Sequence, residues 1–251
     1  MRGKIEKGSI FSSKSFGDYE VLEDEGAKLV RVRFLESGHE KVCQRSSVRR
    51  GNVKDPYYPA VYGKGWIGDG KYVAKVKGKV TKHYHVWSGM LTRCYGYSKP
   101  NHWKTYRENT EVSNEFLDFQ KFSAWFDENY IEGWDLDKDV LSSLRGVNVY
   151  SRETCVFLPP RLNKCLIGQP KINKDLPVGV TEVNTGGYVT RLSLGDVRKY
   201  LGYFDCPKAA FSTYKKAKTE LIRSLTEEYR HLLPTETYNA LLSYQVVAFK
   251  N

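Results

Sequence analysis

The sequence predicts an α+β protein assembled from small domains, and three observations support this. Short runs of alternating apolar and polar residues near the N-terminus predict a small antiparallel sheet. In the centre, segments with helical spacing surround a short acidic hairpin, and near the C-terminus three alternating runs precede a long helix. Because 251 residues exceed one typical domain, we expect boundaries at 1–70, 71–172 and 173–251.

The first predicted domain is a set of short strands. Its alternating runs are separated by glycine-containing turns and cover residues 10–11, 19–22, 29–34 and 41–43. Strands of this length joined by tight turns predict a small meander or an SH3-like barrel.

Two segments of the central domain have the spacing of amphipathic helices. Apolar residues of the segment 83–97 recur at Val86, Met90, Leu91 and Cys94. The segment 115–130 carries a broad aromatic stripe, formed by Phe116, Phe119, Phe122, Trp125 and Phe126. We expect these aromatic side chains to form the core that packs the hairpin between two helices.

The hairpin between these helices and the C-terminal region is rich in carboxylates. Trp134, Leu136 and Val140 alternate with acidic residues, which predicts a strand with three carboxylates on one face: Asp135, Asp137 and Asp139. Further strand pieces are expected at 147–150 and 156–158, and Pro160 opens a helix that carries Asn163. A hard cation such as Mg²⁺ needs only one or two protein oxygens. Asp137 and Asn163 could supply them; the alternative is a solvated acidic hairpin.

The C-terminal region predicts a three-stranded antiparallel sheet followed by a helix. Strands are expected at 179–180, 186–192 and 198–204, and Pro207 begins a long helix with apolar residues through Ala217. The tail 232–251 is predicted to be a packing helix or a dimer contact.

Composition points to a polyanionic partner. The chain has 40 Lys and Arg against 29 Asp and Glu, a formal charge of +11, and its 18 Tyr are interleaved with the basic residues. Duplex DNA is the first candidate partner, and plain solubility is the alternative. The five cysteines form no CxxC pair, so we expect reduced thiols rather than a disulfide framework or zinc ribbon. The N-terminus has no apolar signal core and no run approaches a membrane span, which predicts a cytoplasmic protein without membrane contact.

The segment from Trp134 to Leu166 resembles a degenerate HNH (ββα-metal) endonuclease motif. Asp137 matches the metal-ligand Asp, and Asn163 matches the ligand on the helix. Lys138 stands where the family has its general-base His, and Thr154 replaces the loop Asn. The resemblance implies a Mg²⁺- or Mn²⁺-dependent DNA endonuclease that hydrolyses phosphodiester bonds.

The substitution at position 138 leaves the general base open. A metal-bound water, Asp139 as a further metal ligand or base, or one of His83, His85 and His102 would have to supply it. Carboxylates on both sides favour a protonated Lys138, so we expect it to contact phosphate instead. Arg93, in the pattern W-x-x-M-L-x-R-C-Y, is a second candidate phosphate contact.

The segment KYLGYFDCPKAAFSTY, from Lys199 to Tyr214, is similar to the signature of the ethylene-response-factor (APETALA-type) DNA-binding family. In that family the sheet enters the major groove. The positions carried over are Tyr188, Arg191, Arg198 and Tyr200, with Tyr in place of the family's Trp at 188 and 200. A β-ribbon fits the major groove, and Arg can contact guanine bidentately.

The order of the two resemblances matches phage homing-type endonucleases, in which a small nuclease unit is followed by a DNA reader. This implies a protein of the infected bacterial cytoplasm that acts on double-stranded DNA, as a homodimer or with another phage or host protein. Two alternatives stay open. One is a phage DNA-binding protein whose nuclease site has lapsed, and the other is a host-takeover factor that binds a protein or RNA complex.

Overall fold

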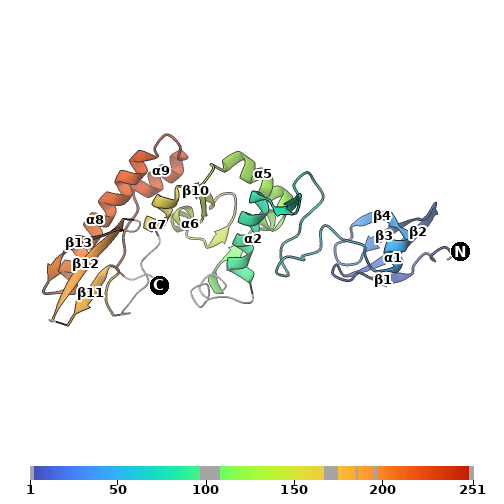
Figure 1. Cartoon of the computed structure of the whole chain (residues 1–251), viewed down its shortest axis with the longest axis horizontal. Helices are drawn as coiled ribbons and strands as arrows, with labels where there is room; N and C mark the ends of the chain where they lie inside the picture. Colours follow the sequence, from blue (N-terminus) through green and yellow to red (C-terminus); the bar gives the residue numbers. More distant parts are fainter. Residues whose placement is uncertain (1–2, 97–107, 167–174, 185, 195–196, 249–251) are drawn as a thin grey trace. The chain divides into compact units, whose positions relative to one another are not determined.

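The computed structural model describes residues 3–96, 108–166, 175–184, 186–194 and 197–248 (Figure 1). The chain divides into two compact units, each formed by two segments. The first unit contains residues 1–128 and 148–152, and the second contains 129–147 and 153–251. The fold is mixed α and β, with several small sheets rather than one large one.

The first unit begins with a four-stranded antiparallel sheet in the order β1-β2-β3-β4. Its strands are β1 (Ile10–Ser12), β2 (Asp18–Gly26), β3 (Leu29–Phe34) and β4 (Glu40–Gln44), followed by α1 (Arg45–Arg49). Alternate side chains point inward, so that Val30, Val32 and Phe34 of β3 are buried while Arg31 and Arg33 are exposed. The predicted strands are therefore confirmed, whereas closure into an SH3-like barrel stays a prediction.

The rest of the first unit is built around an aromatic core. Its elements are β5 (Lys75–Val76), β6 (Lys79–Val80), α2 (Lys82–Tyr95), β7 (Glu111–Val112), α4 (Asn114–Leu117), α5 (Phe119–Asn129) and β9 (Val149–Tyr150). The five aromatic residues of the predicted stripe are all buried, which confirms a core here. The expectation that this core packs the acidic hairpin is wrong, because Val156 and Leu158 of the hairpin are buried in the second unit with residues of α7, α8 and α9. Trp87 of α2 donates its indole N–H to the Phe116 carbonyl oxygen at 2.7 Å, because a buried indole needs an acceptor.

The aromatic segment forms two helices rather than the single one predicted. Asp118 has extended backbone angles and separates α4 from α5. Its Oδ1 accepts a hydrogen bond from the Gln120 backbone N–H at 2.8 Å, so the side chain caps the second helix. Aspartate competes well for backbone N–H groups, which explains a break that the apolar spacing alone does not indicate.

The second unit combines the acidic hairpin with the C-terminal sheet. Its elements are β8 (Asp135–Asp137), α6 (Asp139–Arg145), β10 (Val156–Leu158), α7 (Pro160–Leu166), β11 (Val180–Val183), β12 (Gly187–Leu194), β13 (Val197–Phe204), α8 (Pro207–Glu228) and α9 (Thr235–Leu242). The sheet is antiparallel in the order β11-β12-β13, as predicted, and α8 covers one of its faces.

The prediction of three carboxylates on one strand face is wrong. Strand β8 ends at Asp137, and Asp139 lies in the first turn of α6. Asp137 Oδ1 accepts a hydrogen bond from the Val140 backbone N–H at 3.1 Å, which stabilises the start of this helix. Gly146, at φ 64°, provides the left-handed residue that ends it. The local capping groups therefore override the alternating pattern.

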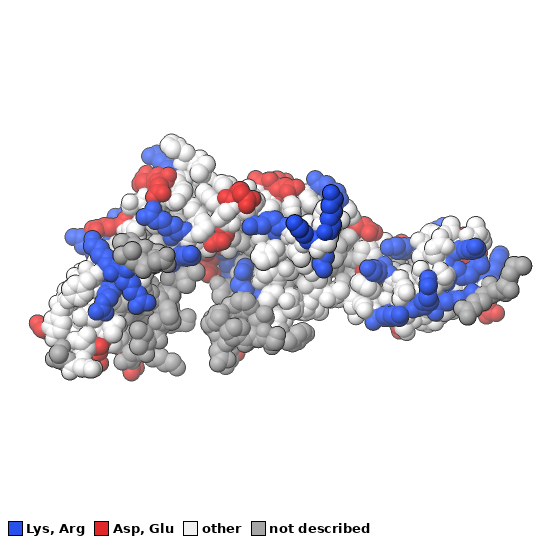
Figure 2. Space-filling view, viewed as in Figure 1, with Lys and Arg blue, Asp and Glu red and all other residues white. Residues whose placement is uncertain are grey.

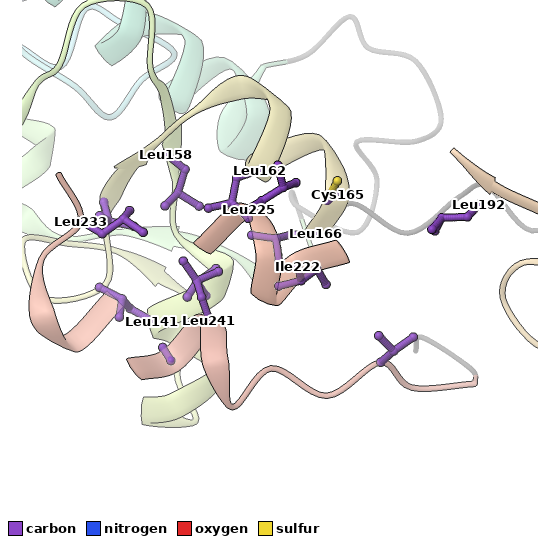
Figure 3. Packing of buried hydrophobic residues seen from close by; sticks show 14 of the residues in the cluster. Leu141, Leu158, Leu162, Cys165, Leu166, Leu192, Ile222, Leu225, Leu233 and Leu241 are labelled. Atoms are coloured by element: carbon purple, nitrogen blue, oxygen red, sulfur yellow. The ribbon is translucent and has the colours of Figure 1, made fainter. Parts of the chain in front are cut away.

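Helix α8 joins the two halves of the second unit in one core. Tyr214 in its first half packs with Leu192 of the sheet, and Ile222 and Leu225 in its second half pack with α7 and α9. Figure 3 shows Leu158, Leu162, Leu225, Ile222 and Leu241 pointing toward one another from four elements. The predicted C-terminal tail thus supplies a packing helix, α9. The buried cluster includes residues from both sides of the domain boundary expected at 172. Position 172 itself lies outside the described residues.

Gly179 explains how closely α8 approaches the sheet. It has φ 79°, and a Cβ built on it would lie 2.4 Å from Cδ2 and Cε2 of Tyr214. Only glycine combines this backbone conformation with the absence of a side chain. The Tyr214 ring therefore packs directly on the backbone that leads into β11.

We predict that Gly179→Ala destabilises the protein by about 2–4 kcal/mol, because the left-handed backbone and the clash with Tyr214 both add cost. Gly186→Ala is the matched control, since it has φ 87° and no described heavy atom within 4 Å of the added Cβ. The control should lose only about 1 kcal/mol. Equal losses for the two variants in denaturant unfolding would show that the Tyr214 contact contributes nothing.

Candidate functional site

The candidate metal site lies on an antiparallel strand pair followed by a helix. β8 pairs with β10 so that Asp137 is opposite Val156, and α7 begins two residues after β10 ends. Helix α7 lies against β8, which makes the elements that carry Asp137 and Asn163 neighbours. Leu162, Cys165 and Leu166 of α7 are buried in the core and hold the helix in this position.

Asp137 is a buried carboxylate at the end of β8. Its residue is 9% exposed, and burial raises the pKa of the carboxyl from 3.8 to about 6. The nearby Asp139 carboxylate also raises this pKa, whereas the Val140 backbone N–H and the Lys138 ammonium lower it. The ionised form is therefore held at a cost that a bound cation would offset.

Lys138 is also buried, with 4% of the residue exposed. Its Nζ donates to Asp139 Oδ1 at 2.5 Å, and the Asp139 side chain is 60% exposed. The residue in the place of the family's general-base His thus forms an ion pair with the neighbouring carboxylate. Whether this lysine contacts a phosphate, as the sequence predicts, stays a prediction.

The other two positions of the HNH resemblance lie in the same unit. Thr154 is buried in the loop before β10, with 1% of the residue exposed. Asn163 lies in the middle of α7 and is half-buried. Strand β8, which carries Asp137, and helix α7, which carries Asn163, lie against each other. The convergence of the Asp137 and Asn163 side chains on one ion stays a prediction.

Arg93 and two of the candidate histidines belong to the first unit. Arg93 Nε donates to the Tyr150 hydroxyl at 3.0 Å, and its guanidinium carbon lies 5.5 Å from the centre of the Tyr150 ring. His83 Nε2 lies 2.6 Å from Asp127 Oδ1, and His85 is exposed. His102 lies outside the described residues. Arg93 and His83 therefore each have a partner within their own unit.

Within the described ranges, no group of three or more His, Cys, Asp or Glu side chains is arranged to hold a metal ion. The predicted pair, the Asp137 carboxylate and the Asn163 amide, has only one member of these four residue types, so a group of this kind would not include it. Its donors are all oxygens, which is the ligand type that Mg²⁺ prefers.

The C-terminal sheet presents basic and aromatic side chains on the face opposite α8, which we call the outer face. Arg191 pairs with Tyr200, and Ser193 pairs with Arg198. The Arg191 guanidinium carbon lies 5.9 Å from the centre of the Tyr200 ring. Figure 2 shows Lys and Arg side chains at the end of the molecule that holds this sheet and α8. The structure thus brings together three of the four predicted DNA-binding residues.

The fourth predicted residue, Tyr188, lies on the other face. On β12 it shares the face of Thr190 and Leu192, which are buried toward α8, and Tyr188 itself is half-buried. Successive side chains of a strand alternate between faces, so Tyr188 and Arg191 point to opposite sides.

Tyr203 is an outer-face residue that the sequence alone did not identify. Thr190 pairs with Gly202 but Arg191 pairs with Tyr200, so Leu201 forms a β-bulge. The extra residue places positions 200 and 203 on the same face, where simple alternation would separate them. Both rings are exposed, at 55% for Tyr200 and 48% for Tyr203. Gly187 makes room for the Tyr203 ring. Gly202, at φ 140°, follows the bulge, and a glycine at this position is the feature of the sequence that could have indicated the bulge.

In comparisons with known proteins, no family model, no curated protein and no solved structure matches this chain.

Among the described residues, no helix combines the length and the apolar character needed to cross a membrane.

We predict that Asp137→Asn stabilises the protein above pH 6 in metal-free buffer. Below the unfolded pKa of 3.8 both states are protonated, so the charge imposes no cost. As the pH rises through about 6, the folded state must ionise a buried carboxyl, and native stability is lost. The gain for Asp137→Asn should therefore be absent near pH 4 and reach on the order of 2 kcal/mol by pH 7.5.

The asparagine retains an oxygen that can accept from the Val140 N–H, whereas Asp137→Ala loses this bond and serves as the control. Thermal unfolding at several pH values measures the difference. A destabilising Asp137→Asn at pH 7.5 would contradict the account of this carboxyl.

Proposed function

We propose that this protein is a metal-dependent DNA endonuclease of the HNH type, with a β-sheet that reads duplex DNA. The observation that carries the proposal is the buried Asp137 carboxylate at the end of β8, beside the helix that bears Asn163. Asp137 also caps α6 through the Val140 N–H, and a carboxyl whose burial raises its pKa to about 6 beside a second oxygen donor is a candidate metal ligand.

Asp137 and Asn163 would hold the ion, which is Mg²⁺ or Mn²⁺. When bound, it would polarise a water molecule and neutralise charge on the phosphodiester. Asp139 would accept the proton of the attacking water, because its carboxylate is exposed and lies two residues from Asp137. Lys138 would act as a positioning residue, since its ammonium holds the Asp139 carboxylate.

The outer face of the sheet would supply DNA recognition separately from the chemistry. Arg191 and Arg198 could contact base edges in the major groove, and Tyr200 holds the Arg191 guanidinium through its ring. Tyr203 extends this face. The proposed activity thus places binding and hydrolysis on different elements of the second unit.

A second candidate function is DNA binding by a protein whose nuclease site has lapsed. The ion pair between Lys138 and Asp139 favours this reading, because it occupies the position of the family's general base. The two functions share the sheet and differ only in cleavage. A phage-encoded protein of either kind would act in the cytoplasm of the infected bacterium, alone, as a homodimer or with another phage or host protein.

We predict that the native chain nicks or cuts duplex DNA with Mg²⁺ or Mn²⁺ and that EDTA stops the reaction. Asp137→Asn should reduce the rate by at least about 100-fold while leaving duplex affinity within about twofold, because the sheet binds independently. Supercoiled plasmid conversion measures the rate, and Glu182→Gln on β11 is the control. Absence of cleavage by the native chain and by Lys138→His, across several divalent metals, would favour the lapsed protein.

We predict that Arg191→Ala and Arg198→Ala each weaken binding to a preferred duplex by about 1–3 kcal/mol, with less effect on random duplexes. The preferred duplex is first selected from a random library, and fluorescence anisotropy measures the affinity. Arg223→Ala is the matched control, since Arg223 is an exposed residue of α8, the helix on the other side of the sheet. Unchanged affinity and specificity in both variants would remove the outer face from the DNA interface.

A further inference from the structure

The first unit contains a β-hairpin that neither resemblance covers. β5 and β6 pair with Lys75 opposite Val80 and Val76 opposite Lys79. The turn between them has positive φ at Lys77 (49°) and Gly78 (78°), which is the geometry of a tight two-residue hairpin. All residues from 75 to 80 are exposed, so the hairpin contributes nothing to the hydrophobic core.

The charge of this hairpin has one sign. Five lysines lie between positions 71 and 82, and that segment contains no Asp or Glu. Lys75, Lys77 and Lys79 form no ion pair with any described residue. Three ammonium groups on one short element repel one another, and none of the described carboxylates forms an ion pair with them. An anionic partner would remove this repulsion.

The two faces of the hairpin are alike. Because paired residues share a face, one side carries Lys75 and Val80 and the other carries Val76 and Lys79. Val76 and Val80 are 53% and 51% exposed. A ribbon that docked on a flat surface would be expected to separate its basic and apolar faces. A cation and an apolar side chain on both faces fit a groove with phosphates along both walls.

The base of the hairpin is held firmly. Gln120 of α5 donates to the Tyr72 carbonyl oxygen at 2.9 Å and accepts from the Tyr72 N–H at 3.1 Å. The Tyr72 hydroxyl donates to Asp127 Oδ2 at 2.7 Å. Thr81 donates to the Val73 carbonyl oxygen at 2.9 Å and also accepts from the Tyr84 N–H at the start of α2. The lysines are therefore presented by a preorganised support, which lowers the entropic cost of binding.

From these observations we propose that the hairpin 75–80 inserts into a groove of duplex DNA and contacts its phosphates without reading sequence. A two-stranded ribbon fits the major groove, and lysine binds phosphate as a point charge. An anionic membrane surface fits less well, because the hairpin's apolar residues are valines and it has no Trp, Phe or Leu to enter the interface. The proposal goes beyond the proposed function, since it requires neither cleavage nor recognition by the C-terminal sheet.

The test replaces Lys75, Lys77 and Lys79 with Gln in the full-length protein and measures affinity for a random-sequence duplex by fluorescence anisotropy. Affinity near 0.1 M salt should fall about 10- to 100-fold, and the slope of log K against log salt should decrease by about 2–3, as expected for the loss of three phosphate contacts. The preferred and random duplexes should be weakened equally, unlike the effect of Arg191→Ala.

Two variants control for charge. Lys4, Lys7 and Lys41 are exposed in the same unit, and their replacement by Gln makes the same change in net charge. This control should retain most of the affinity and the salt slope. The triple Lys→Arg replacement at 75, 77 and 79 should bind like the native protein. The proposal would be overturned if the Gln variant of Lys75, Lys77 and Lys79 lost no more affinity than the Gln variant of Lys4, Lys7 and Lys41.

A second measurement does not depend on substitution. Acetylation of the native protein, read by mass spectrometry, should show Lys75, Lys77 and Lys79 protected by duplex DNA while Lys4, Lys7 and Lys41 stay reactive. Full reactivity of the hairpin lysines in the complex would overturn the proposal. Protection by vesicles of phosphatidylserine and phosphatidylcholine, without protection by duplex, would assign the hairpin to a membrane surface instead.

Discussion

The second unit depends on the packing of one helix. α8 covers the inner face of the three-stranded sheet with Tyr214, and it covers α7 and α9 with Ile222 and Leu225. Each small element buries too little apolar surface to be stable alone. By sharing α8, the acidic hairpin and the sheet obtain one continuous core. The outer face of the sheet and the end of β8 are then left for functional side chains.

The positions that lower stability are also the candidate functional ones. Burial raises the pKa of Asp137, and the lysines of the 75–80 hairpin repel one another with no ion pair to a described carboxylate. A fold selected for stability alone would place an amide at the first position and mixed charges at the second. A divalent cation and a phosphate backbone are the partners that would offset these two costs. Both would belong to the proposed activity on DNA.

Much of the fold follows from the sequence, because periodicity is strong where an element is long or has one buried face. The alternation in β3 and the three C-terminal strands predict their positions, and the aromatic stripe of residues 116–126 predicts the core of the first unit. The α6 helix does not follow from periodicity, because Asp137 begins it through a side-chain hydrogen bond while the residues from 134 to 140 alternate as in a strand. The break at Asp118 has the same cause.

The candidate site, like the fold, could be predicted from the sequence only in part. Arg191, Arg198 and Tyr200 share the outer face, and Tyr203 joins them only because Leu201 forms a bulge, which alternation cannot indicate. The burial of Lys138 and its ion pair with Asp139 depend on three-dimensional packing.

The proposed function depends on the buried Asp137 carboxylate as a ligand for a divalent cation. Binding of Mn²⁺, followed by electron paramagnetic resonance in the presence of a duplex with non-hydrolysable linkages, tests this most directly. We expect one tightly bound Mn²⁺ per native chain and its loss in both Asp137→Asn and Asn163→Ala. Equal Mn²⁺ binding by the native protein and the two variants would contradict it.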